Sequence, residues 1–135
     1  GSSVAIDGDT VVVGATGGAD DTGSAYIFNR SGTSWSERQK LTASDAAIDD
    51  RFGFSVALDG GTALIGARYD DEGGHTNAGS AYVFTGSGSS WAQQQKLIAG
   101  DGGDGDEFGF SVAADGGTVV IGAHRAGVGA IYISP

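Results

Sequence analysis

The chain has 135 residues, which is enough for one domain with a hydrophobic core and too few for two ordinary domains. Its 17 acidic and 7 basic side chains give a net charge of −10, which disfavours binding to nucleic acid or to anionic lipid. The chain has no cysteine, so disulfides and thiolate metal sites are excluded, and its apolar runs are too short to span a membrane.

Glycine is very frequent, with 26 residues, whereas proline occurs once. The hydrophobic fraction of 39% lies in short runs rich in Val, Ile, Ala, Tyr and Phe. Such runs are typical of a packed β protein, so we assign the glycines to turns rather than to a disordered linker.

The first unit, residues 1–41, contains three sequence motifs that recur later in the chain. They are "SSVAIDGDTVVVGA" at 2–15, "GSAYIF" at 23–28 and "SWSERQKL" at 34–41. The first motif contains two apolar runs separated by Asp-Gly, which is a turn signal, so it predicts two strands. Each of the other two motifs predicts one further strand. The unit therefore reads as four short strands.

The second unit, residues 42–97, repeats this order. We predict strands at about Phe54–Leu58, Ala63–Ala67, Ser80–Phe84 and Trp91–Ile98, with a tight hairpin between the first two. The first three are apolar at both odd and even positions, as expected of strands covered on both faces. The fourth carries "AQQQK", as the first unit carries "SERQK", and such polar sequence suits an outermost strand that resists edge-to-edge pairing.

The third unit, residues 98–135, copies the second at an offset of 56 residues. Thirteen of the 16 positions of Phe52–Ala67 are identical in the copy. The segment "GAIYIS" at 129–134 follows and is a diverged copy of the "GSAYIF" motif. The unit stops after its third strand, so we expect about eleven strands in all.

Units of four antiparallel strands with buried inner strands and a polar outer strand are typical of β-propeller blades. A β-sandwich built from hairpins is the main alternative, but it would not normally repeat its sequence so closely. A β-solenoid fits less well, because its coils are shorter. The fold class is therefore all-β, a propeller fragment of about three blades whose last blade lacks its outer strand.

Two short motifs recur together in the second and third units: Phe-Gly before the first strand and Gly-Ala after the second. As a set they resemble the FG-GAP repeats of integrin-α-like propellers. The residues that form these motifs are Phe52, Gly53, Gly66, Ala67, Phe108, Gly109, Gly122 and Ala123. In addition, "QKL" before an Asp loop resembles the bacterial relatives of that family. The resemblance implies a non-catalytic module, extracellular or on the cell surface, that takes part in adhesion or binds a protein or another ligand through loops on one rim.

The chain departs from that family pattern at two places. Thr16, Arg68 and His124 stand where the proline after Gly-Ala is expected. The long calcium loop of the integrin repeats is reduced here to "DGDT" or "DGGT", which is too short to wrap a calcium ion, so integrin-type calcium sites are not carried over.

Three blades are too few to close around an axis. The faces of the first and last blade would expose a broad apolar surface, which soluble monomers rarely tolerate. We therefore expect a homodimer in which two chains complete a six-bladed ring.

Four acids recur in register in the loops at the start of the second and third units: Asp45 pairs with Asp101, and Asp50 pairs with Asp106. Together with carbonyls of a Gly-rich loop they could supply part of a calcium shell, so they are the candidate metal ligands. The alternative is that they accept hydrogen bonds from loop N–H groups and fix the crossover between blades. No cofactor is required, and calcium is possible.

A second group of acids lies in the loop between the second and third strands, and its members are Asp20, Asp21, Asp70, Asp71 and Glu72. The third unit lacks these acids, so this loop cannot hold a site that every blade requires, although it could hold a single local site. His75 and His124 are the only near-neutral bases, and neither lies in a catalytic motif, so we expect no catalytic residues and no enzyme activity.

Trp35 and Trp91 recur at the start of the fourth strands. They raise the possibility of stacking on a carbohydrate, but their recurrence in register is better explained as packing, because an edge strand needs one large apolar residue to hold it to the blade. The leading interpretation is a structural, self-assembling and ligand-binding propeller module. The alternative is a calcium-dependent or carbohydrate-binding, lectin-like propeller.

Overall fold

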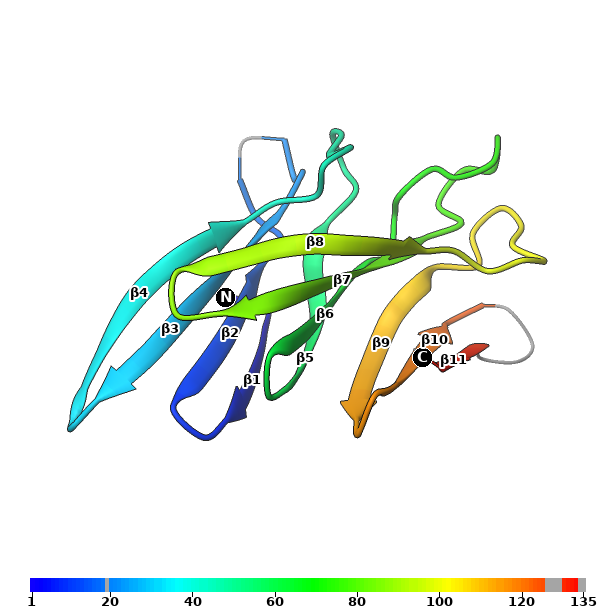
Figure 1. Cartoon of the computed structure of the whole chain (residues 1–135). Coiled ribbons are helices and arrows are strands. Elements are labelled where there is room, and N and C mark those ends of the chain that lie inside the picture. Colours follow the sequence, from blue (N-terminus) through cyan, green and yellow to red (C-terminus); the bar gives the residue numbers. More distant parts are fainter. Residues whose placement is uncertain (19, 126–129, 134–135) are drawn as a thin grey trace.

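The computed structural model describes residues 1–18, 20–125 and 130–133, and this part of the chain contains eleven strands in three antiparallel sheets (Figure 1). In the first sheet the strands are β1 (Ser3–Asp7), β2 (Thr10–Ala15), β3 (Ser24–Ser31) and β4 (Ser34–Leu41). In the second they are β5 (Phe52–Asp59), β6 (Thr62–Ala67), β7 (Ser80–Ser87) and β8 (Ser90–Leu97). The third holds β9 (Phe108–Asp115), β10 (Thr118–Ala123) and β11 (Ala130–Ile133).

Strands follow chain order within each sheet, so every connection inside a sheet is a hairpin. The all-β prediction is confirmed, and the three sheets are consistent with propeller blades. The polar strands β4 and β8 are the outermost strands of their sheets. No helix in the described ranges is long and apolar enough to cross a bilayer.

The third strand of the second sheet is longer than the predicted Ser80–Phe84, because β7 continues to Ser87 and pairs Ser87 with Ser90. The turn is only Gly88 and Ser89, because Gly88 adopts a positive φ of 54° that permits a two-residue hairpin loop.

The sheets stack face to face in chain order. β5 packs against β1 and β2, and β9 packs against β5 and β6, so the first strands of the three sheets adjoin one another (Figure 1). One apolar cluster lies between the first and second sheets and another between the second and third. The middle sheet is covered on both faces, which explains its apolar residues at both odd and even positions.

The Phe-Gly and Gly-Ala motifs meet where consecutive sheets contact each other. A Cβ added to Gly66 of β6 would collide with the carbonyl oxygen of Gly109 in β9, and Gly14 has the same relation to Gly53. The Ser55 hydroxyl donates a hydrogen bond to that Gly109 carbonyl, at 2.7 Å. Gly53 and Gly109 also have φ of 91° and 95°, which favours glycine. The paired glycines therefore let the backbones of neighbouring sheets touch.

A second repeated contact joins the hairpins of consecutive sheets. The Asp7 carboxylate accepts a hydrogen bond from the Gly60 N–H at 2.6 Å, and Asp59 accepts one from the Gly116 N–H at 2.7 Å. The same Asp-Gly hairpin thus makes a turn and also links one sheet to the next.

Candidate functional site

Three carboxylates from two loops converge beside the second sheet. Asp45 lies in the loop between β4 and β5, whereas Asp70 and Glu72 lie in the loop between β6 and β7. One oxygen from each lies within 4.8 Å of the others, and this is the only group of three potential metal ligands in the part of the chain that the structure describes.

The ammonium group of Lys96, from β8, already lies among these carboxylates. Its Nζ is 2.5 Å from Asp45 Oδ2, 2.8 Å from Asp70 Oδ2 and 2.5 Å from Glu72 Oε1. The Tyr82 hydroxyl donates to Asp45 Oδ1 at 2.8 Å and lies 3.1 Å from Asp70 Oδ2. The cluster is thus a three-carboxylate cage occupied by an internal cation, with a formal charge of −2.

Protonation of the cluster follows from its contacts. Burial by itself lowers the pKa of Lys96, but hydrogen bonds to the three carboxylates outweigh it and raise that pKa above its usual range. Burial raises the pKa of Asp45, but hydrogen bonds from Lys96 and Tyr82 bring that pKa below its ordinary value. The Lys96–Asp45 pair therefore stays ionised at neutral pH.

Asp50 is buried close to this cluster and has a different role. Its Oδ2 accepts a hydrogen bond from the Ala47 N–H at 2.8 Å. Burial raises the pKa of Asp50 to about 6, and the charges of Asp70 and Asp45 act in the same direction. Asp106, in register, accepts the corresponding bond from the Gly103 N–H at 2.8 Å.

Of the four predicted metal ligands, the structure brings only Asp45 into a group of three carboxylates within the described residues. Asp50 and Asp106 brace their own loops, the arrangement expected if these acids fix the crossover, and Asp101 is exposed. Calcium binding by the four acids stays a prediction.

The sequence did not reveal that Asp45 joins Asp70 and Glu72, nor that Lys96 lies between them. One signal was available: Tyr and Lys recur together, and β-pairing sets Tyr82 opposite Lys96 and Tyr26 opposite Lys40. In the first sheet Lys40 lies only over the Tyr26 ring, at 5.9 Å. The Tyr–Lys pair thus occurs without carboxylates in the first sheet, and of these two sheets only the second adds them.

Neither histidine ring contacts the three carboxylates, although the backbones of His75 and Glu72 exchange two hydrogen bonds, at 2.8 and 3.1 Å. Nδ1 of His75 lies 3.2 Å from Asp104 Oδ1, and the His124 ring stacks on Phe110 with centroids 4.3 Å apart.

Trp91 is buried against the first sheet, where its backbone N–H donates to Gln39 Oε1 at 2.7 Å and its carbonyl accepts from Gln39 Nε2 at 2.9 Å. This burial covers the ring faces that a sugar would need, so the geometry supports the packing role of Trp91. Trp35, its counterpart in the first sheet, is half-exposed under the Arg30 guanidinium.

The outer faces of the first and third sheets are apolar and exposed. Val4, Ile6 and Trp35 are 72%, 65% and 42% exposed, although their repeat counterparts Val56, Leu58 and Trp91 are 9%, 9% and 6% exposed. On the third sheet Val120 is 41% exposed, whereas its counterpart Leu64 is fully buried. These are the positions that a neighbouring sheet covers inside the molecule.

The comparisons with known proteins agree with this geometry. No curated protein matched the chain. The family model described as the FG-GAP repeat matches residues 1–28, 35–84 and 91–134, which are most of the sequence and include parts of all eleven strands. Modules of this kind are typically non-catalytic. With its paired glycines, its repeated sheets and this match, the chain belongs to the FG-GAP repeat family.

Proposed function

We propose that this chain is a non-catalytic, propeller-building module whose two end faces pair with those of a second copy. Two copies of three blades would then form one six-bladed ring with cyclic symmetry. The observation that carries the proposal is the exposure of Val4, Ile6 and Val120 at positions that are buried or partly buried where two sheets of this chain meet.

The internal interfaces describe what such a pairing would look like. Between the first and second sheets, Val56 and Leu58 pack in one cluster with Val12 and Ile27. Val4 and Ile6 would meet the third sheet of the partner in the same manner. Apolar surface removed from water is the main driving force for such an association.

The hydrogen bond between Asp-Gly hairpins would also fix the register in which the two end faces pair. Asp7 and Asp59 each bind the first glycine N–H of the next hairpin, and Asp115 is the exposed third member of that series. Gly8 has the corresponding place in the first sheet. Asp115 would therefore accept a hydrogen bond from the N–H of Gly8 of the partner subunit.

Light scattering at low micromolar concentration tests the assembly. We expect twice the chain mass of 13.4 kDa. Ile6→Lys places a charge on the end face and should give a monomer that is still folded. Ile48→Lys is the matched control, because Ile48 is equally exposed but lies in the loop before β5. A wild-type monomer, or a dimer that Ile6→Lys leaves intact, would exclude the proposal.

The ring would present its loops for binding a protein or a glycan, and the family resemblance supports a place outside the cell or on its surface. The chain as a whole carries a net charge of −10. Basic ligands are thus favoured and anionic ones disfavoured.

The Asp45, Asp70 and Glu72 cage supports a second candidate, binding of a divalent cation. Carboxylate oxygens are preferred ligands of calcium, but the Lys96 ammonium competes for the same oxygens. Lys96→Met should therefore strengthen calcium binding, seen as a larger rise of the melting temperature at millimolar calcium. If neither the wild type nor this variant shifts, this candidate is excluded.

A further inference from the structure

Two arginines lie beside one tyrosine at the ends of β5 and β6. Arg51 immediately precedes β5, whereas Arg68 and Tyr69 immediately follow β6, the strand that pairs with β5. The guanidinium carbon Cζ of Arg68 is 4.4 Å from the centre of the Tyr69 ring, and Cζ of Arg51 is 5.1 Å from it. Cζ of Arg68 is also 4.0 Å from the centre of the Phe54 ring. These cation–π contacts hold the two guanidinium groups in place, but their N–H donors still need acceptors.

Both guanidinium groups are short of acceptors. Three buried side-chain atoms have no hydrogen-bond partner in the part of the chain that the structure describes, and two of them are Nε of Arg51 and Nε of Arg68. Nη1 of Arg68 donates to Glu107 Oε2 at 3.5 Å, but the opposite edge, Nε with Nη2, has no acceptor among the described residues. Nη2 of Arg51 lies 3.6 Å from Asp21 Oδ2, which is longer than a good hydrogen bond.

Arg30 shows the arrangement of a satisfied guanidinium in the same chain. Its Nε and Nη2 both donate to Asp9 Oδ1, at 3.0 and 2.7 Å. The Arg30 side chain is 46% exposed, whereas those of Arg51 and Arg68 are 35% and 17% exposed. An unmatched donor costs more at the two less exposed positions, because water replaces the acceptor less readily there. The edge that a carboxylate occupies on Arg30 is thus open on Arg68.

The local charge also favours an anion at this place. Nε of Arg125 lies 3.6 Å from Glu107 Oε1, so Arg68 and Arg125 share this carboxylate. Arg51 has Asp21 alone as an ion-pair partner among the described residues. Three arginines therefore share two carboxylates, which leaves an excess of positive charge in a chain whose net charge is −10.

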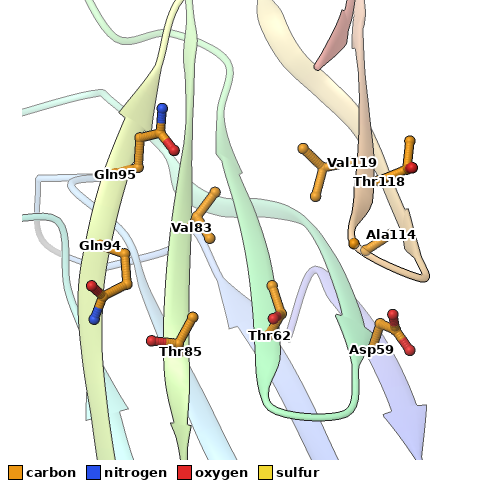
Figure 2. Close-up of a pocket in the computed structure, with 10 residues that line it drawn as sticks. Asp59, Thr62, Val83, Thr85, Gln94, Gln95, Ala114, Thr118 and Val119 are labelled. Carbon is orange, nitrogen blue, oxygen red and sulfur yellow. The ribbon is translucent and has the colours of Figure 1, made fainter. Parts of the chain in front are cut away.

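The cavity of about 270 Å³ between the second and third sheets lies elsewhere (Figure 2). It is lined by Asp59 and Thr62, at the hairpin end of β5 and β6, whereas Arg51 and Arg68 are at the other end of these strands. Asp59 is the only charged side chain in its lining, so this cavity would repel an anion.

We propose that Arg51 and Arg68 form a binding site for a single carboxylate, presented by an aspartate or glutamate side chain of a protein ligand. The Nε–Nη2 edge of a guanidinium matches the two oxygens of a carboxylate, and the second arginine adds charge. The rest of the ligand is uncharged or basic, because the net charge of −10 repels polyanions. The site contains none of the exposed residues of the end faces, so the proposal does not depend on their pairing.

NMR titration of the isotope-labelled full chain with the peptide acetyl-Gly-Glu-Gly-amide tests the site. Acetyl-Gly-Gln-Gly-amide is the matched neutral peptide, and sodium chloride at equal ionic strength controls for screening. We expect saturable shifts of the Nε–Hε signals of Arg51 and Arg68, with affinity at least about tenfold weaker for the Gln peptide.

Two variants locate the binding. Arg51→Gln removes one of the two cations and should weaken binding of the Glu peptide at least about fivefold. Arg30→Gln is the control, because Arg30 already has Asp9 as its partner, and it should leave the affinity unchanged.

Four results would overturn the proposal: no saturable shift at about 20 mM peptide, equal affinity for the two peptides, shifts that sodium chloride reproduces, or unchanged binding by folded Arg51→Gln. Tighter binding of inorganic phosphate than of the Glu peptide would likewise overturn the assignment to a carboxylate. The peptide pair leaves the protein unaltered, so it remains decisive if Arg51→Gln does not fold.

Discussion

Phe52 and Phe108 begin the innermost strands of the second and third sheets, and both side chains are buried against the preceding sheet. The Phe52 ring meets Tyr82 and Phe84 edge-on, with centroids 5.3 and 5.9 Å away. The aromatic residue of the Phe-Gly motif is therefore a packing element of the interface between sheets and not a ligand contact.

Replacing Phe108 with Ala should lower the free energy of unfolding by about 3–5 kcal/mol, because a large side chain would be lost from a site with little freedom to collapse. Phe110→Ala is the control, since Phe110 is only partly buried and stacks on His124. Urea unfolding followed by circular dichroism measures both. Equal, small losses for the two variants would contradict the packing role of Phe108.

Asp50 makes stability depend on pH in a direction opposite to that of most surface carboxylates. Its pKa of about 6 in the folded protein exceeds the ordinary value of 3.8, so the folded state keeps this proton to higher pH than the unfolded state. Its contribution is therefore complete below about pH 4 and is lost as pH rises through 6.

Asp50→Asn removes this titration and should stabilise the protein at pH 7, by at most roughly 3 kcal/mol. The gain should shrink toward pH 4, where the folded wild-type carboxyl is protonated and a large part of the unfolded form is protonated as well. Asp106→Asn is the matched control, because Asp106 makes the same loop hydrogen bond but its repeat has Ala126 in place of Asp70. Thermal melts from pH 4 to 8 would refute the account if the gain of Asp50→Asn did not vary with pH.

At the scale of the elements, sequence periodicity was sufficient to place most strands, since each apolar run is bounded by an Asp-Gly or Gly-rich signal. It failed at β7, where the polar residues of "TGS" continue the strand because they pair with β8 at an exposed edge.

The candidate site was less accessible to prediction. Asp45 and Lys96 are far apart in the chain and meet only because β8 ends beside the loop that enters β5. No local pattern encodes such a contact.

The glycine pairs offer a test of how the sheets are joined. Gly66→Ala should cost about 1–3 kcal/mol or more, because the new methyl group meets the Gly109 backbone carbonyl, which cannot move without displacing β9. Gly122 is the same position in the third sheet, but an added methyl group there meets mainly the Ser111 hydroxyl, which can rotate away. Gly122→Ala should thus cost less than about 1 kcal/mol. If both variants lose equal stability in denaturant unfolding of the monomer, backbone contact between sheets is not what selects glycine.

At the scale of the whole molecule, the same contacts that join sheets within a chain are left exposed at its two ends. Repetition explains this, because every blade carries both a face for its predecessor and a face for its successor. The proposed dimer would join one face of each kind, and the net charge of −10 would act against its formation.

The repeated aspartates separate folding from assembly, because Asp59 acts within the chain and Asp115 would act between chains. Asp59→Ala removes the bond to the Gly116 N–H and should lower the stability of the monomer by about 1 kcal/mol. Asp115→Ala should leave that stability unchanged and weaken dimerisation by about 30-fold, because the closed ring contains this contact twice and the loss is therefore about 2 kcal/mol per dimer. Sedimentation equilibrium gives the dimer constant, and unfolding of the two variants in the Ile6→Lys background gives the monomer stability. A dimer constant unaffected by Asp115→Ala would mean that the hairpin contact is not repeated between chains, so the two end faces would have to meet in a register different from that of the internal interfaces.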